Sequence, residues 1–163
     1  MTKYRIKHYL IIASLLCFII CSTSICSTTI VFAQNTTSAI TNKTIEDSYD
    51  SIVNIQKQLS AILKQYFHHL VDDTSPKPST SLLDIYSNQL NEISPKLEDI
   101  VSSNASESQK TKSQILISAI HYLKPAINDI RTLLTSSDYE RQYTLFRSII
   151  YLDSLLTEIL AYF

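Results

Sequence analysis

The sequence predicts an all-α protein: an antiparallel up-down-up-down four-helix bundle preceded by an N-terminal signal or anchor segment. Two observations predict this fold. The 163-residue chain contains no glycine, which tight hairpins and phosphate-binding loops use where the backbone takes a positive φ. Apolar residues recur every three or four positions in four long segments joined by short polar links. We therefore expect helices at about 45–71, 81–101, 110–134 and 138–163, packed with the heptad spacing of coiled coils.

The first helix is expected to begin after Thr44, an N-cap followed by Glu46 and Asp47 in the first turn, where the helix dipole favours acids. Gln56 is the only polar residue in the apolar seam of this helix. The segment 72–80 contains two prolines and should end the helix. The seam itself comprises Ile45, Tyr49, Ile52, Leu59, Leu63, Tyr66 and Leu70.

The second and third helices are separated by a polar loop at about 102–109 and carry one interior proline each, Pro95 and Pro125. Both prolines fall opposite the apolar seam, which favours a helix that continues and bends around its core. The alternative is that Ser94 caps a new helix with Pro95 at its first position. The seams are Leu83, Tyr86, Leu90, Ile93, Leu97 and Ile100 in the second helix, and Leu116, Ile120, Leu123, Ile127, Ile130 and Leu134 in the third.

The fourth helix should open with a capping box at 137–140, with Ser137 at the N-cap. Its seam is Leu145, Ile149, Leu152, Leu156, Ile159 and Phe163, and only a narrow wedge of the remaining surface is polar. One interpretation is a well-covered helix whose tyrosines span the edge of the core. The other is a surplus aromatic flank that docks a protein partner or a second copy of the chain. The candidate partner surface is Tyr143, Tyr151 and Tyr162.

The first 33 residues have the layout of a secretory signal peptide. Three basic residues precede the apolar run 10–20, and a small residue, Ala33, stands before Gln34 at a plausible cleavage point. The alternative is an uncleaved membrane anchor, although the unbroken apolar run is eleven residues and a spanning helix needs about 20. In either case we expect the rest of the chain to be extracytoplasmic: secreted, periplasmic, cell-surface or lumenal. A flexible lead-in over 34–43 and a bundle over 44–163 would follow.

Composition weighs against several kinds of chemistry. All three cysteines lie in the first 33 residues, so no disulfide or thiolate metal site is expected in the exported part. Removing the three basic residues of the leader from 14 leaves eleven against 15 acidic residues, which argues against a nucleic-acid partner. We expect His68, His69 and His121 to be exposed, and no catalytic, cofactor-binding or metal-binding residues are assigned. Asp153, at the edge of the fourth apolar seam, is expected to pair with a Lys or Arg of a neighbouring helix, and the alternative is a functional role.

The sequence therefore favours an exported, non-enzymatic helical bundle that acts as a protein-interaction or accessory subunit at or outside the membrane. The alternative is a membrane-tethered bundle that binds or senses a small ligand, for which Gln56 is the single hint. Contact with a membrane is expected only through an uncleaved N-terminal segment. Three Asn-x-Ser/Thr triplets, at Asn35, Asn42 and Asn104, fall in expected loops and would matter in a host that N-glycosylates.

Overall fold

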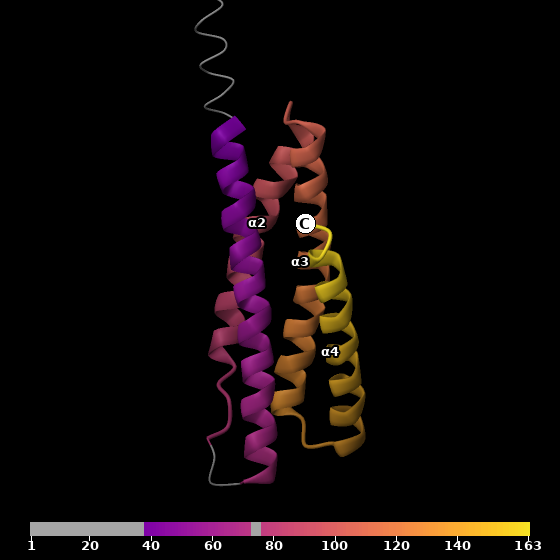
Figure 1. Ribbon diagram of the computed structural model, residues 1–163. Helices are drawn as coiled ribbons and strands as arrows, with labels where there is room; N and C mark the ends of the chain where they lie inside the picture. The colour runs from indigo at the N-terminus through magenta and orange to yellow at the C-terminus, as the bar shows by residue number, and fades with distance from the viewer. Residues whose placement is uncertain (1–37, 73–75) are drawn as a thin grey trace, which may run out of the picture. The chain divides into compact units, whose positions relative to one another are not determined.

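The computed structural model describes residues 38–72 and 76–163, and within these ranges the chain forms four helices and no strands (Figure 1). The first helix covers residues 38–71. It is followed by α2 (Ser81–Ser102), α3 (Glu107–Thr135) and α4 (Tyr139–Leu160). This all-helical architecture is consistent with the expected four-helix bundle. The predicted leader, the cleavage point at Ala33 and Gln34, and Asn35 lie outside the described residues.

Residues 41–163 form one unit around a single apolar core. The predicted seams of α2 and α3 are confirmed, because all twelve of their residues are buried. The seam of the first helix is rotated relative to the prediction: Ile55 and Ile62 are buried, whereas Leu70 is 53% exposed. A seam read from a single helix fixes its apolar side only to within about one residue of rotation, and packing against α2 and α3 selects the final orientation.

The first helix begins earlier than expected. Residues 38–43, predicted as part of a flexible lead-in, are helical. Thr44 lies inside the helix and not at its N-cap, and its carbonyl accepts a hydrogen bond from Ser48 Oγ at 2.6 Å. Asn42 Oδ1 accepts a hydrogen bond of 2.8 Å from Gln109 Nε2 of α3. This contact between distant parts of the chain supports a polar turn that would be marginal as an isolated helix.

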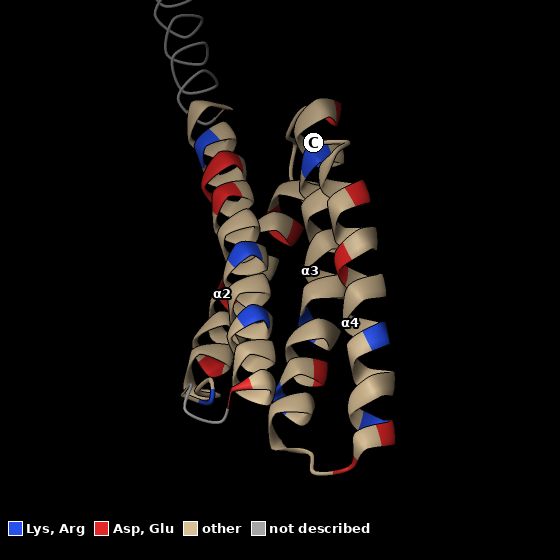
Figure 2. Ribbon diagram, turned by 60° about the horizontal axis from the view of Figure 1, so that its bottom comes forward, with Lys and Arg blue, Asp and Glu red and all other residues tan. Residues whose placement is uncertain are grey.

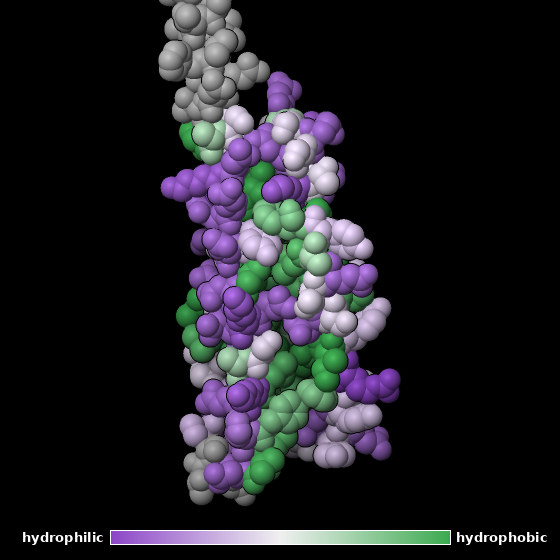
Figure 3. Space-filling model, viewed as in Figure 1, coloured by the Kyte–Doolittle hydropathy of each residue, from purple (hydrophilic) through white to green (hydrophobic). Residues whose placement is uncertain are grey.

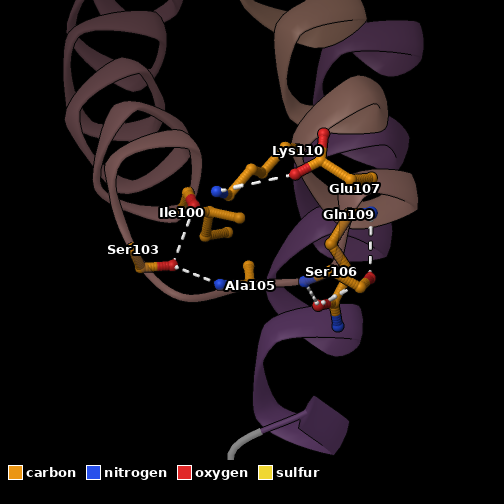
Figure 4. A network of polar contacts seen from close by, with 7 residues as sticks. All are labelled: Ile100, Ser103, Ala105, Ser106, Glu107, Gln109 and Lys110. Atoms are coloured by element: carbon orange, nitrogen blue, oxygen red, sulfur yellow. Dashed lines mark hydrogen bonds and ion pairs between the residues drawn. The ribbon is translucent and has the colours of Figure 1, made fainter.

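The link between α2 and α3 is shorter than expected, because α3 begins three residues earlier. Ser106 is the N-cap: its side chain accepts a hydrogen bond from the Gln109 amide, and Gln109 Oε1 accepts one from the Ser106 amide (Figure 4). This reciprocal capping box satisfies two backbone donors that would otherwise lack partners. Ser103 Oγ donates to the Ile100 carbonyl at 2.8 Å and closes the end of α2. Asn104 lies in the exposed turn between the two helices.

The start of α4 is displaced by one residue from the prediction. Asp138 is the N-cap, and its side chain accepts hydrogen bonds from the amides of Glu140 and Arg141. A carboxylate at this position also interacts favourably with the helix dipole, which a serine does not. The helix ends at Leu160, and Phe163 beyond it stacks on Tyr49 of the first helix with 4.3 Å between the ring centroids.

Both interior prolines lie within continuous helices, as the unbroken seams predict. Pro95 is part of α2 and Pro125 is part of α3, and both are exposed. Ser94 does not cap a new helix: it is buried, and its hydroxyl donates to Glu98 Oε1 at 2.9 Å. Proline has no N–H group, so the carbonyl four residues before it in the helix loses its usual hydrogen-bond donor. Because each proline is on the solvent side of its helix, this carbonyl also faces water.

The helix ends are closed without any residue of positive φ in the described ranges. Ser103 and Ser136, which follow α2 and α3, have φ of −82° and −73° and extended ψ. Ala161, which follows α4, stays in the right-handed helical region. These conformations are open to any residue, which is how a chain without glycine ends its helices.

Contacts between side chains align the helices in pairs. Besides Tyr49 with Phe163, Gln56 meets Asp153 at 2.9 Å, and the rings of Phe67 and Phe146 are 4.7 Å apart. An ion pair of 2.7 Å between Asp84 and Arg131 joins α2 to α3. A hydrogen bond of 2.7 Å from Ser148 to Asp129 joins α4 to α3.

Candidate functional site

Helix α4 exposes more large apolar and aromatic side chains than α2 or α3 does. This helix buries three side chains, Ile149, Leu156 and Leu160, whereas α2 buries seven and α3 eleven. The interpretation of α4 as a well-covered helix is therefore wrong. Leu145, Leu152 and Ile159 of its predicted seam are only half-buried, since α4 packs on α3 along one side.

Of the three tyrosines predicted as a partner surface, Tyr143 and Tyr151 lie on one stripe of α4, and Tyr162 follows in the turn after the helix. Their separations of eight and eleven residues are close to two and three helical turns, so they follow one face of the helix. Tyr143, Tyr151 and Tyr162 are 58%, 64% and 73% exposed. The complete stripe, called the α4 stripe below, also contains three exposed polar residues and reads Tyr143, Arg147, Tyr151, Ser154, Glu158 and Tyr162. Tyrosine and arginine are enriched in protein interfaces, because each combines a large contact area with a polar group.

An aromatic pocket adjoins the first turns of α4. Tyr139, Tyr143 and Phe146 of α4 face Tyr66 and Phe67 of the first helix around a cavity of about 160 Å³. The rings of Phe67 and Phe146 meet edge to face at 74°, the geometry that aromatic pairs prefer. Burial raises the pKa of the Tyr66 hydroxyl. Hydrophobic side chains gather on this part of the surface between the first helix and α4 (Figure 3).

No local pattern in the sequence marks this pocket. The one sequence feature that could have indicated the pocket is Phe67, a large aromatic residue one position away from the predicted seam. In the structure its side chain is 38% exposed. Its partner Phe146 is 79 positions further along the chain, and no local pattern connects the two.

Gln56 and Asp153, the two polar residues found in or beside apolar seams, meet each other. Gln56 Nε2 donates to Asp153 Oδ1 at 2.9 Å and lies 3.0 Å from Thr157 Oγ1. The expected Lys or Arg partner of Asp153 is not found among the described residues, and the prediction of an ion pair is wrong. An amide can satisfy a carboxylate at the rim of the core without the cost of burying a second charge.

A small cavity opens beside this polar contact, between the first helix, α3 and α4. Its volume is about 90 Å³. Its wall is mainly apolar, with Gln56, Ser60, Tyr122 and Asp153 as the polar groups. The structure thus places the single sequence hint of ligand binding, Gln56, on the wall of a cavity.

None of the described histidines lines the aromatic pocket or the cavity beside Gln56 and Asp153. His68 and His121 are exposed, as expected, whereas His69 is half-buried. In residues 38–72 and 76–163, no three His, Cys, Asp or Glu side chains are grouped so that they could hold a metal ion. Among the helices of the same ranges, none combines the length and the apolar character needed to cross a membrane.

Of the possible glycosylation sites, Asn42 is not in a loop as expected, because its side chain bonds Gln109 within a helical turn. Asn104 does lie in a turn, and the hydroxyl of the third residue of its triplet, Ser106, is engaged in the cap of α3. A glycan on Asn42 would therefore replace a hydrogen bond of the fold, whereas one on Asn104 would extend into solvent.

Comparison with protein families, with curated proteins and with solved structures finds no match to this chain. The candidate sites therefore rest on the geometry of the described residues. They are the α4 stripe, the aromatic pocket at the start of α4, and the cavity beside Gln56 and Asp153.

Proposed function

We propose that this protein is an exported, non-enzymatic helical bundle that acts as a protein-interaction or accessory subunit at or outside the membrane. The observation that carries this proposal is the exposure of α4. Its three stripe tyrosines are each more than half exposed, while only three residues of the helix are buried. Large aromatic side chains left in solvent by the bundle gain free energy when a second protein covers them.

The proposal includes an up-down-up-down order of the four helices. Contacts between the first helix and α4 support it, because their residue numbers run in opposite directions: 49 with 163, 56 with 153, and 67 with 146. Asp84 near the start of α2 contacts Arg131 near the end of α3, and Asp129 near the end of α3 contacts Ser148 in α4, as antiparallel neighbours do. Short links between neighbouring helices favour this arrangement.

Export is supported by the order of the first 33 residues, in which a basic start, an apolar run and a small residue precede Gln34. Fractionation of the producing cells, with sequencing of the mature N-terminus, tests this part of the proposal. We expect an extracytoplasmic protein that begins at Gln34. A cytoplasmic protein that retains Met1 would contradict it.

The interaction is tested by cross-linking the full chain in the cells that make it. A photoreactive phenylalanine analogue at Tyr151 should cross-link to another protein chain, whereas the same group at Lys96, on the exposed side of α2, should not. Replacing all three stripe tyrosines by serine should abolish cross-linking from a probe placed at Ser154. Leu82→Ser with Ile85→Ser is the matched control, since both residues are exposed on α2.

The stability of the tyrosine variants decides how the result is read. Exposed substitutions change the free energy of unfolding by roughly 0.5 kcal/mol or less each, so thermal unfolding should show an intact fold. Equal cross-linking from Tyr151 and Lys96, or cross-linking that persists in the folded triple variant, would remove α4 as the interaction surface.

A second candidate function, the binding of a small ligand, is favoured by the cavity beside Gln56 and Asp153. Asp153 forms no ion pair within the described residues, and apolar side chains line the space next to its carboxylate. This combination fits a small protonated amine with a short alkyl group. A cavity of about 150 Å³ holds benzene, so a volume of about 90 Å³ limits the apolar part to roughly three or four carbons.

Butylamine and butanol form a matched pair of probes for this site. Butylamine should shift the NMR signals of residues that line the cavity and raise the midpoint of thermal unfolding. Butanol, which lacks the charge, should bind more weakly, and Asp153→Asn should remove the difference. Identical behaviour of the two probes in the unaltered protein would exclude an amine site.

A further inference from the structure

Aromatic rings form most of the wall of the aromatic pocket at the start of α4. Five of the eight described side chains that line it are Phe or Tyr, and the others are two leucines and Gln142. Gln142 Nε2 donates a hydrogen bond of 2.7 Å to the Ser136 carbonyl, so this amide group is already engaged. The described wall contains no charged side chain, and its chemistry is mainly that of the rings. These rings belong to Tyr66, Phe67, Tyr139, Tyr143 and Phe146.

Neighbouring rings of the pocket stand at steep angles to each other. The planes of Phe67 and Phe146 meet at 74°, with 4.7 Å between their centroids. The planes of Tyr66 and Phe67 meet at 63°. Rings at such angles form adjoining walls instead of stacking on one another. Because the face of an aromatic ring carries partial negative charge, a space enclosed by several rings attracts a cation.

The bundle leaves this space open to solvent. Tyr139 is 81% exposed and Tyr143 is more than half exposed, whereas Tyr66 is buried. The cavity between the rings has a volume of about 160 Å³. A cavity of about 150 Å³ holds benzene, and a trimethylammonium group has fewer non-hydrogen atoms than benzene. The pocket is therefore large enough for such a group and can be reached from outside.

Two helices end beside the pocket. The first helix and α3 finish at the same end of the bundle, and the lining residues Leu70 and Leu133 belong to their last turns (Figure 1). The last carbonyl groups of a helix carry partial negative charge. Neither last turn contains Lys or Arg, and His68 and His69 of the first helix do not line the pocket. These helix ends favour a cation, as the rings do.

Exposed charges of both signs surround the pocket without lining it. Asp138 and Glu140 are acidic, whereas Arg141, Lys64 and Arg147 are basic, and all five are exposed. The carboxylate of Asp138 also accepts two backbone amides at the positive end of α4 and offsets the dipole there. Figure 2 shows acidic and basic residues together at the start of α4. Because water screens these mixed charges, the lining decides which ligand fits.

We propose that the aromatic pocket binds a quaternary ammonium group, as carried by choline. Such a group has no N–H, so it needs no hydrogen-bond acceptor and can be held by ring faces alone. A primary ammonium group has three N–H donors to satisfy, which suits the cavity beside Asp153 better than this pocket. The site goes beyond the proposed function, because it does not depend on whether α4 contacts another protein.

Choline and its uncharged analogue, in which carbon replaces nitrogen, form a matched pair of probes. NMR titration of the full chain, in the form that the cells leave it, measures both Kd values from the ring signals of the pocket. Choline should bind at least about tenfold more tightly, since the two probes differ in charge and hardly in shape. Equal Kd values, tighter binding of the analogue, or binding of neither probe would overturn the proposal.

Two double variants separate the rings from the hydroxyl groups. Tyr139→Leu with Tyr143→Leu should raise the Kd of choline at least about fivefold, whereas Tyr139→Phe with Tyr143→Phe keeps the rings and should leave it unchanged. Tyr151→Leu with Tyr162→Leu is the matched control, because these exposed rings lie outside the pocket. All six substitutions are at exposed positions, so thermal unfolding should show intact folds. An equal loss in the leucine and phenylalanine variants would contradict a cation held by rings.

Two further measurements define the site and the source of the group. Asp153→Asn should leave choline binding unchanged, and a loss there would assign choline to the other cavity and overturn the proposal. Vesicles of phosphatidylcholine carry the same group on a lipid, and vesicles of phosphatidylglycerol lack it. Cosedimentation with the first alone, lost in the leucine variant, would support the site and identify a lipid head group as its ligand. Choline binding without cosedimentation would support a soluble ligand.

Discussion

The third and fourth helices have equally regular apolar seams but differ in how far the fold covers them. α3 packs against both α2 and α4, and eleven of its side chains are buried. α4 packs on α3 along one side and meets the first helix through a few aromatic and polar contacts, and it buries three. Periodicity therefore shows which side of a helix is apolar, whereas the number of neighbours decides how much of that side is removed from water.

The largest expected effect comes from comparing two isoleucines, one in each helix. Ile127 of α3 is fully buried and Ile150 of α4 is 53% exposed. Ile127→Ala should lower the free energy of unfolding by about 3 kcal/mol, because it removes buried methyl groups and leaves a cavity. Ile150→Ala should lower it by less than about 1 kcal/mol. Urea unfolding followed by circular dichroism measures both, and equal losses would show that α4 is covered as well as α3.

A smaller effect of opposite sign is expected at a serine of α3. The hydroxyl of Ser113 is buried and, within the described residues, has no hydrogen-bond partner. Ser113→Ala should raise the free energy of unfolding by about 1 kcal/mol, since it removes an unsatisfied buried polar group. Ser118→Ala is the control, because that exposed hydroxyl bonds the Gln114 carbonyl in its own helix. A loss of stability at Ser113 would mean that its hydroxyl is satisfied in solution.

The smallest effect is expected at Tyr66, a tyrosine that the bundle covers. Burial raises the pKa of Tyr66, so above pH 10 (roughly the ordinary tyrosine pKa) the unfolded chain loses this proton before the folded chain does. Stability is therefore full below that pH and falls as the pH rises toward the folded pKa. Tyr66→Phe should flatten this alkaline loss. The free energy of unfolding, measured across the alkaline range, would show identical profiles if Tyr66 were not desolvated.

Much of the fold could be predicted from the sequence, because it depends on short-range patterns. The seams of α2 and α3 and the passage of both helices through Pro95 and Pro125 are of this kind. The start of the first helix was missed because it depends on Asn42 meeting Gln109, 67 positions away. The start of α4 was missed by one residue, since Ser137 and Asp138 are both good caps and the choice between them is geometric.

The candidate sites were predictable as residues but not as arrangements. The sequence marks Gln56 and Asp153 as unusual, and each was interpreted alone. Their contact depends on the level at which the first helix and α4 lie beside each other, which packing decides. The same holds for the aromatic pocket, whose walls come from the first helix and from α4. The tyrosine stripe could be predicted, because its members lie at helical spacing within one segment of the chain.

The closure of every described helix without a positive φ has a consequence for how this sequence can change over time. Where a fold needs left-handed residues, certain positions are reserved for glycine or asparagine. In the described ranges no backbone position makes such a demand. Side-chain polarity, volume and capping ability are then the main requirements that selection for the fold can enforce, and many residues satisfy each of them. The sequence of such a bundle can diverge widely while the backbone is kept. The order of charges and the spacing of apolar residues would then be retained longer than individual amino acids.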